Sequence, residues 1–188
     1  MFRKHLLLAA ALLLLCHLAS AQKKVAFGTN VLEWAYLGTV NLEAGVGVSQ
    51  HVSLTAGGKL NLWSFDDQDR DIVVQDQRQN AFFGMRYWPW YVYSGWWAGF
   101  KGQYEKRYSS GVWRPALEES TAVGGVLSAG YAIMLHKHFN IDFGAGIFGG
   151  RYLDYTLYRC ADCAVIRQQG PRNFIKVDDI MVSLTFIF

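Results

Sequence analysis

Apolar side chains alternate with polar or small ones along much of the chain. The alternation is clearest over residues 40–48, 52–62, 139–147 and 180–188. A period of two places every second side chain on the same face of a β-strand, so each stretch predicts a strand with one apolar face. We expect eight strands, over residues 24–33, 39–49, 52–64, 80–89, 94–106, 121–135, 138–153 and 174–188.

The connections between these strands differ in length in a regular way. The long polar ones are 64–79, 107–120 and 154–173, and the short ones are 34–38, 50–51, 89–93 and 136–137. Short turns at one end and long loops at the other are typical of outer-membrane barrels. The pattern predicts an all-β fold, an eight-stranded antiparallel up-and-down transmembrane β-barrel.

The face opposite the apolar one carries charged residues. They are Glu43, Lys59, Arg86, Lys101, Glu105, Asp142 and Asp179. Each would cost a few kcal/mol in contact with lipid at mid-membrane, so we expect them to line the interior and pair there. Eight strands leave an interior just wide enough for side chains. This favours a plugged interior over a narrow channel. A soluble lipocalin-like barrel, with its apolar face inward, is the competing fold.

Aromatic residues cluster around one of the short turns. They are Tyr87, Trp88, Trp90, Tyr91, Tyr93, Trp96 and Trp97. Trp and Tyr concentrate where a membrane meets water, so we expect this set to form the periplasmic aromatic girdle. A second girdle is expected at the opposite strand ends, from Trp63, Phe65, Tyr104, Tyr108, Tyr152 and Tyr155.

The first 21 residues have the features of a secretory signal peptide. Arg3 and Lys4 precede an apolar run from Leu6 to Leu15, and Ala19-Ser20-Ala21 follows. This order predicts cleavage after Ala21, leaving 22–188 as one barrel domain exported to the outer membrane. The whole chain has a formal charge of +3, with 18 basic and 15 acidic residues. Without Arg3 and Lys4 the balance is nearly neutral, which argues against a nucleic-acid partner.

Cys160 and Cys163 form a C-x-x-C pair in a predicted long loop. A thioredoxin-like redox motif needs a strand-to-helix context, and zinc needs two further ligands. Because export places the chain in an oxidising compartment, we expect a local structural disulfide.

His51, His136 and His138 are the histidines that remain after signal cleavage. Lipid-modifying barrel enzymes pair a histidine with Ser or Asp near the outer leaflet. These three fall on predicted periplasmic turns, so we interpret them as polar turn residues. The sequence indicates no catalytic set, no cofactor and no metal site.

Several short motifs resemble those of one protein family. They are Gly28–Leu32, Arg86–Trp88, Gly125–Tyr131, Cys160–Cys163 and Val182–Phe188. Their order and spacing resemble the uncharacterised family of small outer-membrane β-barrels of Bacteroidetes, a domain of unknown function. The resemblance implies an eight-stranded barrel in the outer membrane and supplies no catalytic residues. The terminal Phe188 resembles the C-terminal signal read by the outer-membrane assembly machinery.

These observations favour a non-enzymatic outer-membrane barrel with a filled interior, acting as a structural, interaction or accessory envelope protein. Expected partners are outer-membrane lipid, the assembly machinery during biogenesis, and other envelope or surface proteins. A lipid-modifying enzyme and a narrow channel are the alternatives. Purified protein would deacylate or re-acylate lipid in the first case and conduct ions across a bilayer in the second.

Overall fold

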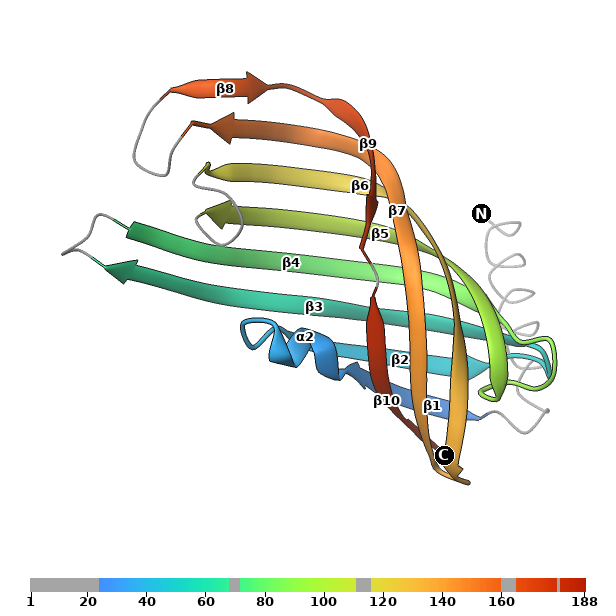
Figure 1. Ribbon diagram of the computed structural model, residues 1–188. Helices are drawn as coiled ribbons and strands as arrows, with labels where there is room; N and C mark the ends of the chain where they lie inside the picture. Colours follow the sequence, from blue (N-terminus) through green and yellow to red (C-terminus); the bar gives the residue numbers. More distant parts are fainter. Residues whose placement is uncertain (1–23, 68–71, 111–115, 160–164, 179) are drawn as a thin grey trace, which may run out of the picture.

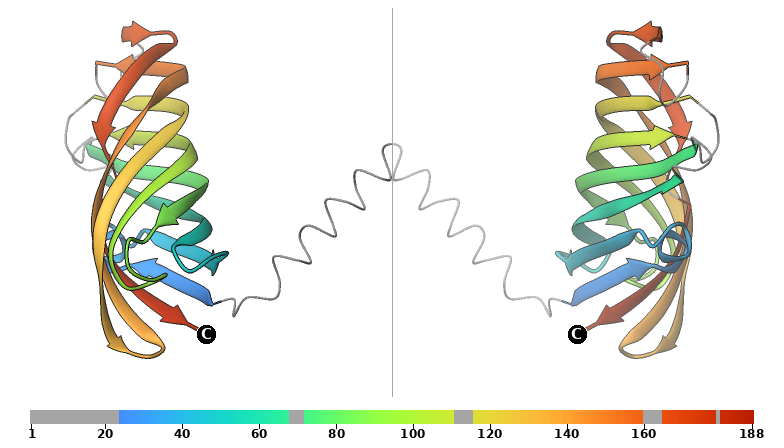
Figure 2. Two further views of the ribbon diagram at one scale, coloured as in Figure 1. Left: turned by 90° about the vertical axis from the view of Figure 1, so that its right-hand side faces the viewer. Right: turned by 90° about the vertical axis from the view of Figure 1, so that its left-hand side faces the viewer.

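The computed structural model describes residues 24–67, 72–110, 116–159, 165–178 and 180–188, which form one antiparallel sheet closed into a barrel (Figures 1 and 2). Its elements are β1 Val25–Asn30, α2 Val31–Ala35, β2 Val40–Gly47, β3 Val52–Asp67, β4 Ile72–Tyr87, β5 Gly95–Ser110, β6 Glu118–His136, β7 Phe139–Tyr158, β8 Ile166–Gln169, β9 Arg172–Val177 and β10 Met181–Ile187. In the described part of the chain, no helix is long and apolar enough to cross a membrane.

The last three strands together fill the eighth position of the wall. β8, β9 and β10 all pair with β7 in the same antiparallel sense, one after another along its length. β10 also pairs with β1, from Ala26 opposite Ile187 to Asn30 opposite Ser183, and this pairing closes the barrel. The predicted eight-stranded antiparallel barrel is confirmed.

The strands are strongly staggered around the barrel. Thr185 on β10 pairs with Gly28 on β1. When the paired residues are followed from Gly28 strand by strand around the barrel, the path returns to the eighth strand at Phe174 on β9, eleven residues before Thr185. Such a stagger requires tilted strands. β3 to β7 have 16 to 20 residues, whereas β1 has 6 and β2 has 8. The wall is therefore tall from β3 round to β9 and low at β1 and β2 (Figure 1).

Several element limits differ from those predicted. β7 extends to Tyr158, into the expected loop 154–173. β3 extends to Asp67 and β4 begins at Ile72, so most of the expected loop 64–79 is strand. The alternation is hidden there because both faces are polar, with Gln77 and Gln79 on the outside. Residues 31–33, predicted as the end of the first strand, are helical, because the Asn30 side chain accepts a hydrogen bond from the Leu32 amide and starts α2.

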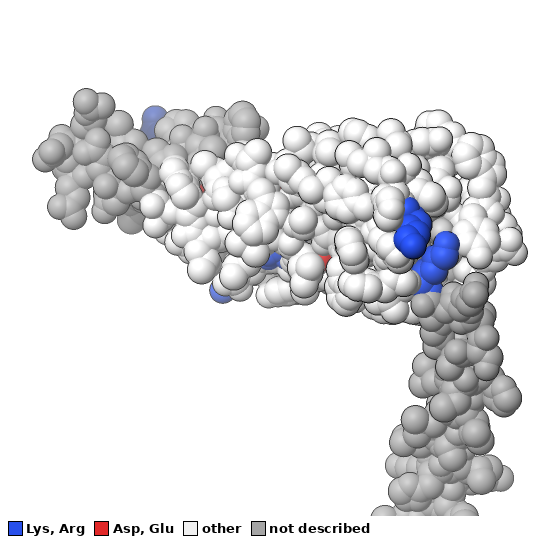
Figure 3. Space-filling model, turned by 90° about the horizontal axis from the view of Figure 1, so that it is seen from below, with Lys and Arg blue, Asp and Glu red and all other residues white. Residues whose placement is uncertain are grey.

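The two faces of the wall have opposite chemistry. Outward side chains such as Phe83, Met85 and Leu127 are 63%, 53% and 67% exposed. The inward Lys101 and Asp142 are 6% and 2% exposed. Seen from below the view of Figure 1, the outer surface shows few charged side chains, and its most visible basic patch lies at the end that holds the short turns (Figure 3). The apolar face points outward, which is the reverse of a lipocalin-like barrel.

Candidate functional site

The end of the barrel that holds the short turns is closed by an aromatic cluster. Trp88, Tyr93 and Trp97 are at most 4% exposed and pack together inside the wall. The Trp88 indole donates a hydrogen bond to Ser53 Oγ at 3.0 Å, and the Arg86 guanidinium lies 4.5 Å from the Trp97 ring centroid. These large side chains plug this end.

The aromatic girdle therefore differs from the expected set. Trp88, Tyr93 and Trp97 belong to the plug, because their strand and turn positions point inward. The exposed members are Tyr87, Trp90, Tyr91 and Trp96. At the opposite strand ends Tyr104 is exposed, but Tyr152 and Tyr155 are buried against Phe148 inside the barrel. The Phe65 side chain lies outside the described residues.

Charged side chains in the lower interior, the half nearer the short turns, each contact a partner. Arg86 Nη2 lies 2.6 Å from Glu43 Oε1, and Asp142 accepts a hydrogen bond from the Thr185 hydroxyl at 2.7 Å. The Lys101 ammonium lies 4.3 Å from the Phe82 ring centroid. A cavity of about 30 Å³ between these groups has room for about two water molecules.

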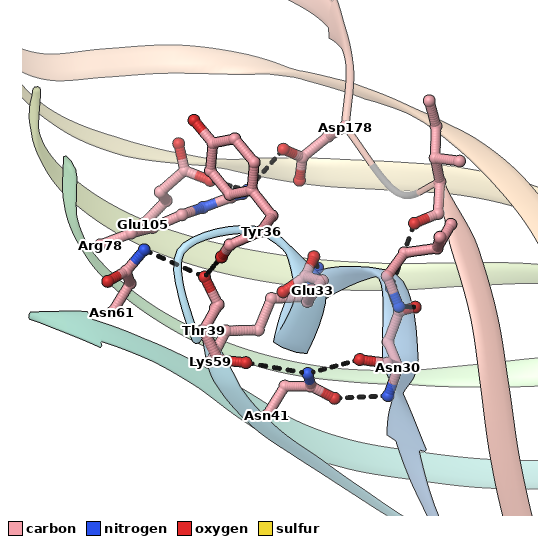
Figure 4. Close-up of polar contacts among 12 residues, drawn as sticks. Asn30, Glu33, Tyr36, Thr39, Asn41, Lys59, Asn61, Arg78, Glu105 and Asp178 are labelled. Carbon is pink, nitrogen blue, oxygen red and sulfur yellow. Dashed lines mark hydrogen bonds and ion pairs between the residues drawn. The ribbon is translucent and has the colours of Figure 1, made fainter. Parts of the chain in front are cut away.

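A second group of polar side chains lies in the upper interior, the half nearer the long loops. This group, which we call the upper cluster, consists of Arg78, Gln103, Glu105, Lys176 and Asp178. Arg78 Nη2 lies 2.8 Å from Glu105 and 2.5 Å from Asp178. Lys176 Nζ lies 2.6 Å from Glu105, and Gln103 donates to Asp178 at 2.9 Å. The upper cluster thus joins β4, β5 and the eighth strand across the barrel interior (Figure 4).

α2 lies beside the upper cluster and is held by polar contacts (Figure 4). Glu33, 9% exposed, pairs with Lys59 at 2.5 Å. Asn41 accepts from the Asn30 amide at 2.6 Å and donates to the Asn30 carbonyl at 2.9 Å. Asn61 donates to the Thr39 hydroxyl at 3.0 Å. The helix and the loop after it take the place where the upper parts of β1 and β2 would run.

A gap in the strand wall lies next to α2. Among the described residues, β1 ends at Asn30 opposite Ser183, and β2 begins at Val40 opposite Leu60. No described strand pairs with the free edge of β9, or with β3 beyond Leu60. The Trp63 amide on that edge donates instead to the Asn61 side chain at 2.9 Å.

The expected interior charges are placed together with others that the alternation did not identify. Inward cations in the described residues include Lys59, Arg78, Arg86, Lys101, Arg107 and Lys176, and inward anions include Glu33, Glu43, Asp76, Glu105, Asp142 and Asp178. Most of these cations lie beside one of these anions. Asp179 lies outside the described residues, and its neighbour Asp178 is the inward carboxylate. Asp76 and Arg78 were missed because polar residues occupy both faces around them.

Two of the histidines contact backbone carbonyl groups. His51 Nδ1 lies 3.0 Å from the Trp88 carbonyl oxygen and His138 Nδ1 lies 2.8 Å from that of Ile187, both at the short-turn end. Cys160 and Cys163 lie outside the described residues, so their disulfide stays a prediction. The part of the chain that the structure describes holds no group of three or more His, Cys, Asp or Glu placed to bind a metal.

Sequence comparisons place the chain in one family. No curated protein and no solved structure matches it. Residues 7–188 match the family described as "Protein of unknown function (DUF3575)", and the chain therefore belongs to this family.

Proposed function

We propose that the chain is a non-enzymatic outer-membrane β-barrel protein that serves as a structural or interaction component of the cell envelope. The observation that carries the proposal is the inverted distribution of side chains, apolar outside and charged inside. Large contiguous apolar surfaces are rare on soluble monomers. Lipid would cover this one, and paired contacts make the buried interior charges tolerable.

The lengths of the strands support a membrane position for only part of the barrel. A transmembrane β-strand needs about 9–11 residues, whereas β5 has 16 and β7 has 20. Outward side chains change from apolar to polar at Gln79, Lys106 and Arg151. Beyond these residues the strands would project from the outer leaflet as a rigid polar rim, on the side away from the short turns. This rim is the surface we assign to envelope partners.

The filled interior favours this function over a narrow channel. The Trp88, Tyr93 and Trp97 side chains fill the short-turn end, and the cavity between the lower charges has a volume of only about 30 Å³. The contacts of His51 and His138 with backbone carbonyls likewise favour a structural role for these residues over lipid chemistry.

Refolding of the chain without residues 1–21 into phospholipid vesicles tests the proposal. We expect a protease-resistant species that migrates differently on gels before and after heating. We also expect no conductance above that of empty bilayers and no release of fatty acid from the vesicle lipid. A chain that folds in buffer without lipid or detergent would contradict the membrane position. Conductance or deacylation would contradict a plugged, non-enzymatic barrel.

A further inference from the structure

The outer face of β5, β6 and β7 carries an apolar groove, which we call the outer groove. Ala98, Ala129 and Ala145 pair in register across the three strands and form its floor. The paired rows on either side have larger side chains, which are Trp96, Tyr131 and Phe143 in one row and Phe100, Leu127 and Ile147 in the other. The groove reaches Val177 on β9 and has a volume of about 530 Å³. It therefore offers room to a hydrocarbon chain on the surface that we assign to lipid.

A polar pocket, which we call the rim pocket, lies farther up the same three strands (Figure 1). Its volume is about 350 Å³, and the outward side chains that line it are Lys106, Tyr108, Glu119, Thr121, Asp154 and Thr156. None of these six side chains forms a hydrogen bond or an ion pair with another described residue. Thr156 is only 9% exposed, so its hydroxyl group is enclosed by the pocket without a partner in the described part of the chain. The pocket thus combines room with unused polar groups.

The spacing of the groove and the pocket matches one leaflet of a membrane. Arg151 marks the change from apolar to polar on the outside of β7, and Ala145 lies six residues before it. Six residues of strand span roughly 20 Å, which becomes about 14 Å along the membrane normal for a strand tilted by about 45°. Half of a hydrocarbon core is about 15 Å thick. A lipid with its headgroup beyond Arg151, beside Asp154, would lay its acyl chains along the groove.

The polar groups of the rim pocket narrow the class of headgroup. The Lys106 ammonium is only a donor, the Glu119 and Asp154 carboxylates are only acceptors, and the hydroxyl groups act as both. A phosphate group alone offers acceptors and a negative charge, so it would leave both carboxylates unmatched. Sugar hydroxyl groups donate to carboxylates and accept from an ammonium. The volume of the pocket also lies within the range of about 300–1,000 Å³ that is usual for small-molecule sites.

We propose that the outer face of β5, β6 and β7 binds a glycolipid of the outer leaflet, with its sugar headgroup in the rim pocket and its acyl chains along the outer groove. The sugar donates hydrogen bonds to Glu119 and Asp154 and accepts one from Lys106. The proposal rests on the membrane position proposed above, and it gives the polar rim a partner of defined chemistry.

Native mass spectrometry of the barrel, refolded without residues 1–21, tests this site. The barrel is released from micelles that contain equal amounts of monoglucosyl diacylglycerol, phosphatidylethanolamine, phosphatidylglycerol and diacylglycerol, all with the same acyl chains. We expect one monoglucosyl diacylglycerol to be retained per chain, about tenfold more strongly than any other lipid, because hydrogen bonds to charged groups form with the sugar alone.

One pair of variants tests the rim pocket. Glu119→Gln should weaken retention of the glycolipid about fivefold, because a hydrogen bond to a charged group becomes one to a neutral group. Glu118→Gln is the matched control and should leave retention within about twofold, since neighbouring residues of a strand face opposite sides. Glu118 does not line the pocket.

A second pair tests the outer groove. Ala129→Leu fills the floor of the groove and should weaken retention of the glycolipid about fivefold, because acyl-chain contacts are lost. Ala81→Leu is its control, at an exposed position on β4 that does not line the groove, and should leave retention within about twofold.

Equal retention of the four lipids by the unaltered chain, or strongest retention of a lipid without sugar, would overturn the site, and this comparison needs no variant to fold. Equal effects within either pair of variants would also overturn it. Any of these results in a chain that inserts into vesicles leaves the proposed membrane function standing. A chain that fails to insert contradicts the proposed function itself.

Discussion

Trp97 enters the barrel interior only because its neighbours are small. A Cβ atom on Gly130 or Gly144 would lie 2.5 Å or 2.8 Å from Trp97 Cζ2. Such a distance is too short for carbon atoms, so a side chain at either position would push the indole out of the plug.

Gly144→Ala should therefore lower the free energy of unfolding by about 1–3 kcal/mol, the usual cost of overpacking. Gly102→Ala is the matched control, because its added Cβ would meet nothing closer than the Phe83 carbonyl oxygen at 3.9 Å. Denaturant titration of both variants in the same detergent measures the difference. Equal unfolding free energies for the two variants would show that Trp97 is not tightly packed.

Arg86 connects the plug to the interior charges through Glu43 and the Trp97 ring. Arg86→Met leaves Glu43 without this partner in a mostly buried site and should cost about 3–5 kcal/mol of unfolding free energy. Arg86→Met combined with Glu43→Leu removes both charges and should recover most of that loss, because a hydrophobic pair can replace a buried ion pair. Both are measured by denaturant unfolding. A single variant as stable as the parent chain would contradict the paired interior.

Sequence reasoning identified interior charges where the alternation has a clear apolar face. Lys59 and Lys101 could be assigned to the interior because Leu60 and Phe100 beside them define the outer face. Asp76 and Arg78 have glutamines on the outside, so no apolar residue marked the inward positions. The grouping of Arg78 with Asp178 depends on strands that are distant in the chain and could not be read from local pattern.

Among the elements, α2 is held mainly by one residue, Asn30, at the seam where β1 pairs with β10 and the barrel closes. The Asn30 side chain accepts from the Leu32 amide at 3.2 Å and the Val182 amide at 3.1 Å, and donates to the Ile180 carbonyl at 3.1 Å. It therefore joins β1, α2 and the eighth strand at the point where the wall becomes incomplete.

Asn30→Ala should lower the free energy of unfolding by about 2–3 kcal/mol, because a helix cap and two further hydrogen bonds are lost. The exposed Asn173 on β9 provides the control, and Asn173→Ala should change stability by less than about 0.5 kcal/mol. Thermal unfolding in detergent compares the two. If the two variants were equally stable, Asn30 would have no special part in the seam.

The pairing at the seam is also short compared with the rest of the wall. β1 pairs with β10 over five residues, whereas β5 pairs with β6 over fifteen. We expect amides of β1 and of the free edge of β9 to exchange with deuterium well before those of β5, because weakly paired elements open first. Hydrogen exchange with mass spectrometry measures this order. Uniform protection across all strands would contradict an incomplete wall.

The position of the gap could not be predicted from the sequence. Alternation predicted β1 and β2 as ordinary strands and gave no sign of α2, since Val31, Leu32 and Trp34 are apolar and suit an outer face in either conformation. The gap follows from the stagger of eleven residues around the barrel, which sets β9 beside the low part of the wall. Stagger is a property of the closed sheet and is not visible in any single strand.

For the whole molecule, the period of two was sufficient to predict the fold class. It is preserved where one face is apolar, and a predicted strand corresponds to each of the eight positions of the wall. The same pattern indicated which face turns outward, and the exposed Phe83 and buried Asp142 agree with it. The aromatic plug was assigned to a girdle instead, because composition near a turn does not distinguish inward from outward positions.

The central claim is that the outer face of the barrel contacts lipid while the inner face is sealed from it. It is tested most directly by spin labels placed one at a time along residues 96–101 of β5, in vesicles and on a chain with Cys160 and Cys163 replaced by serine. We predict high oxygen accessibility at Trp96, Ala98 and Phe100, and low accessibility at Trp97, Gly99 and Lys101. The opposite phase, or equal accessibility to a water-soluble nickel reagent at all six positions, would contradict the account.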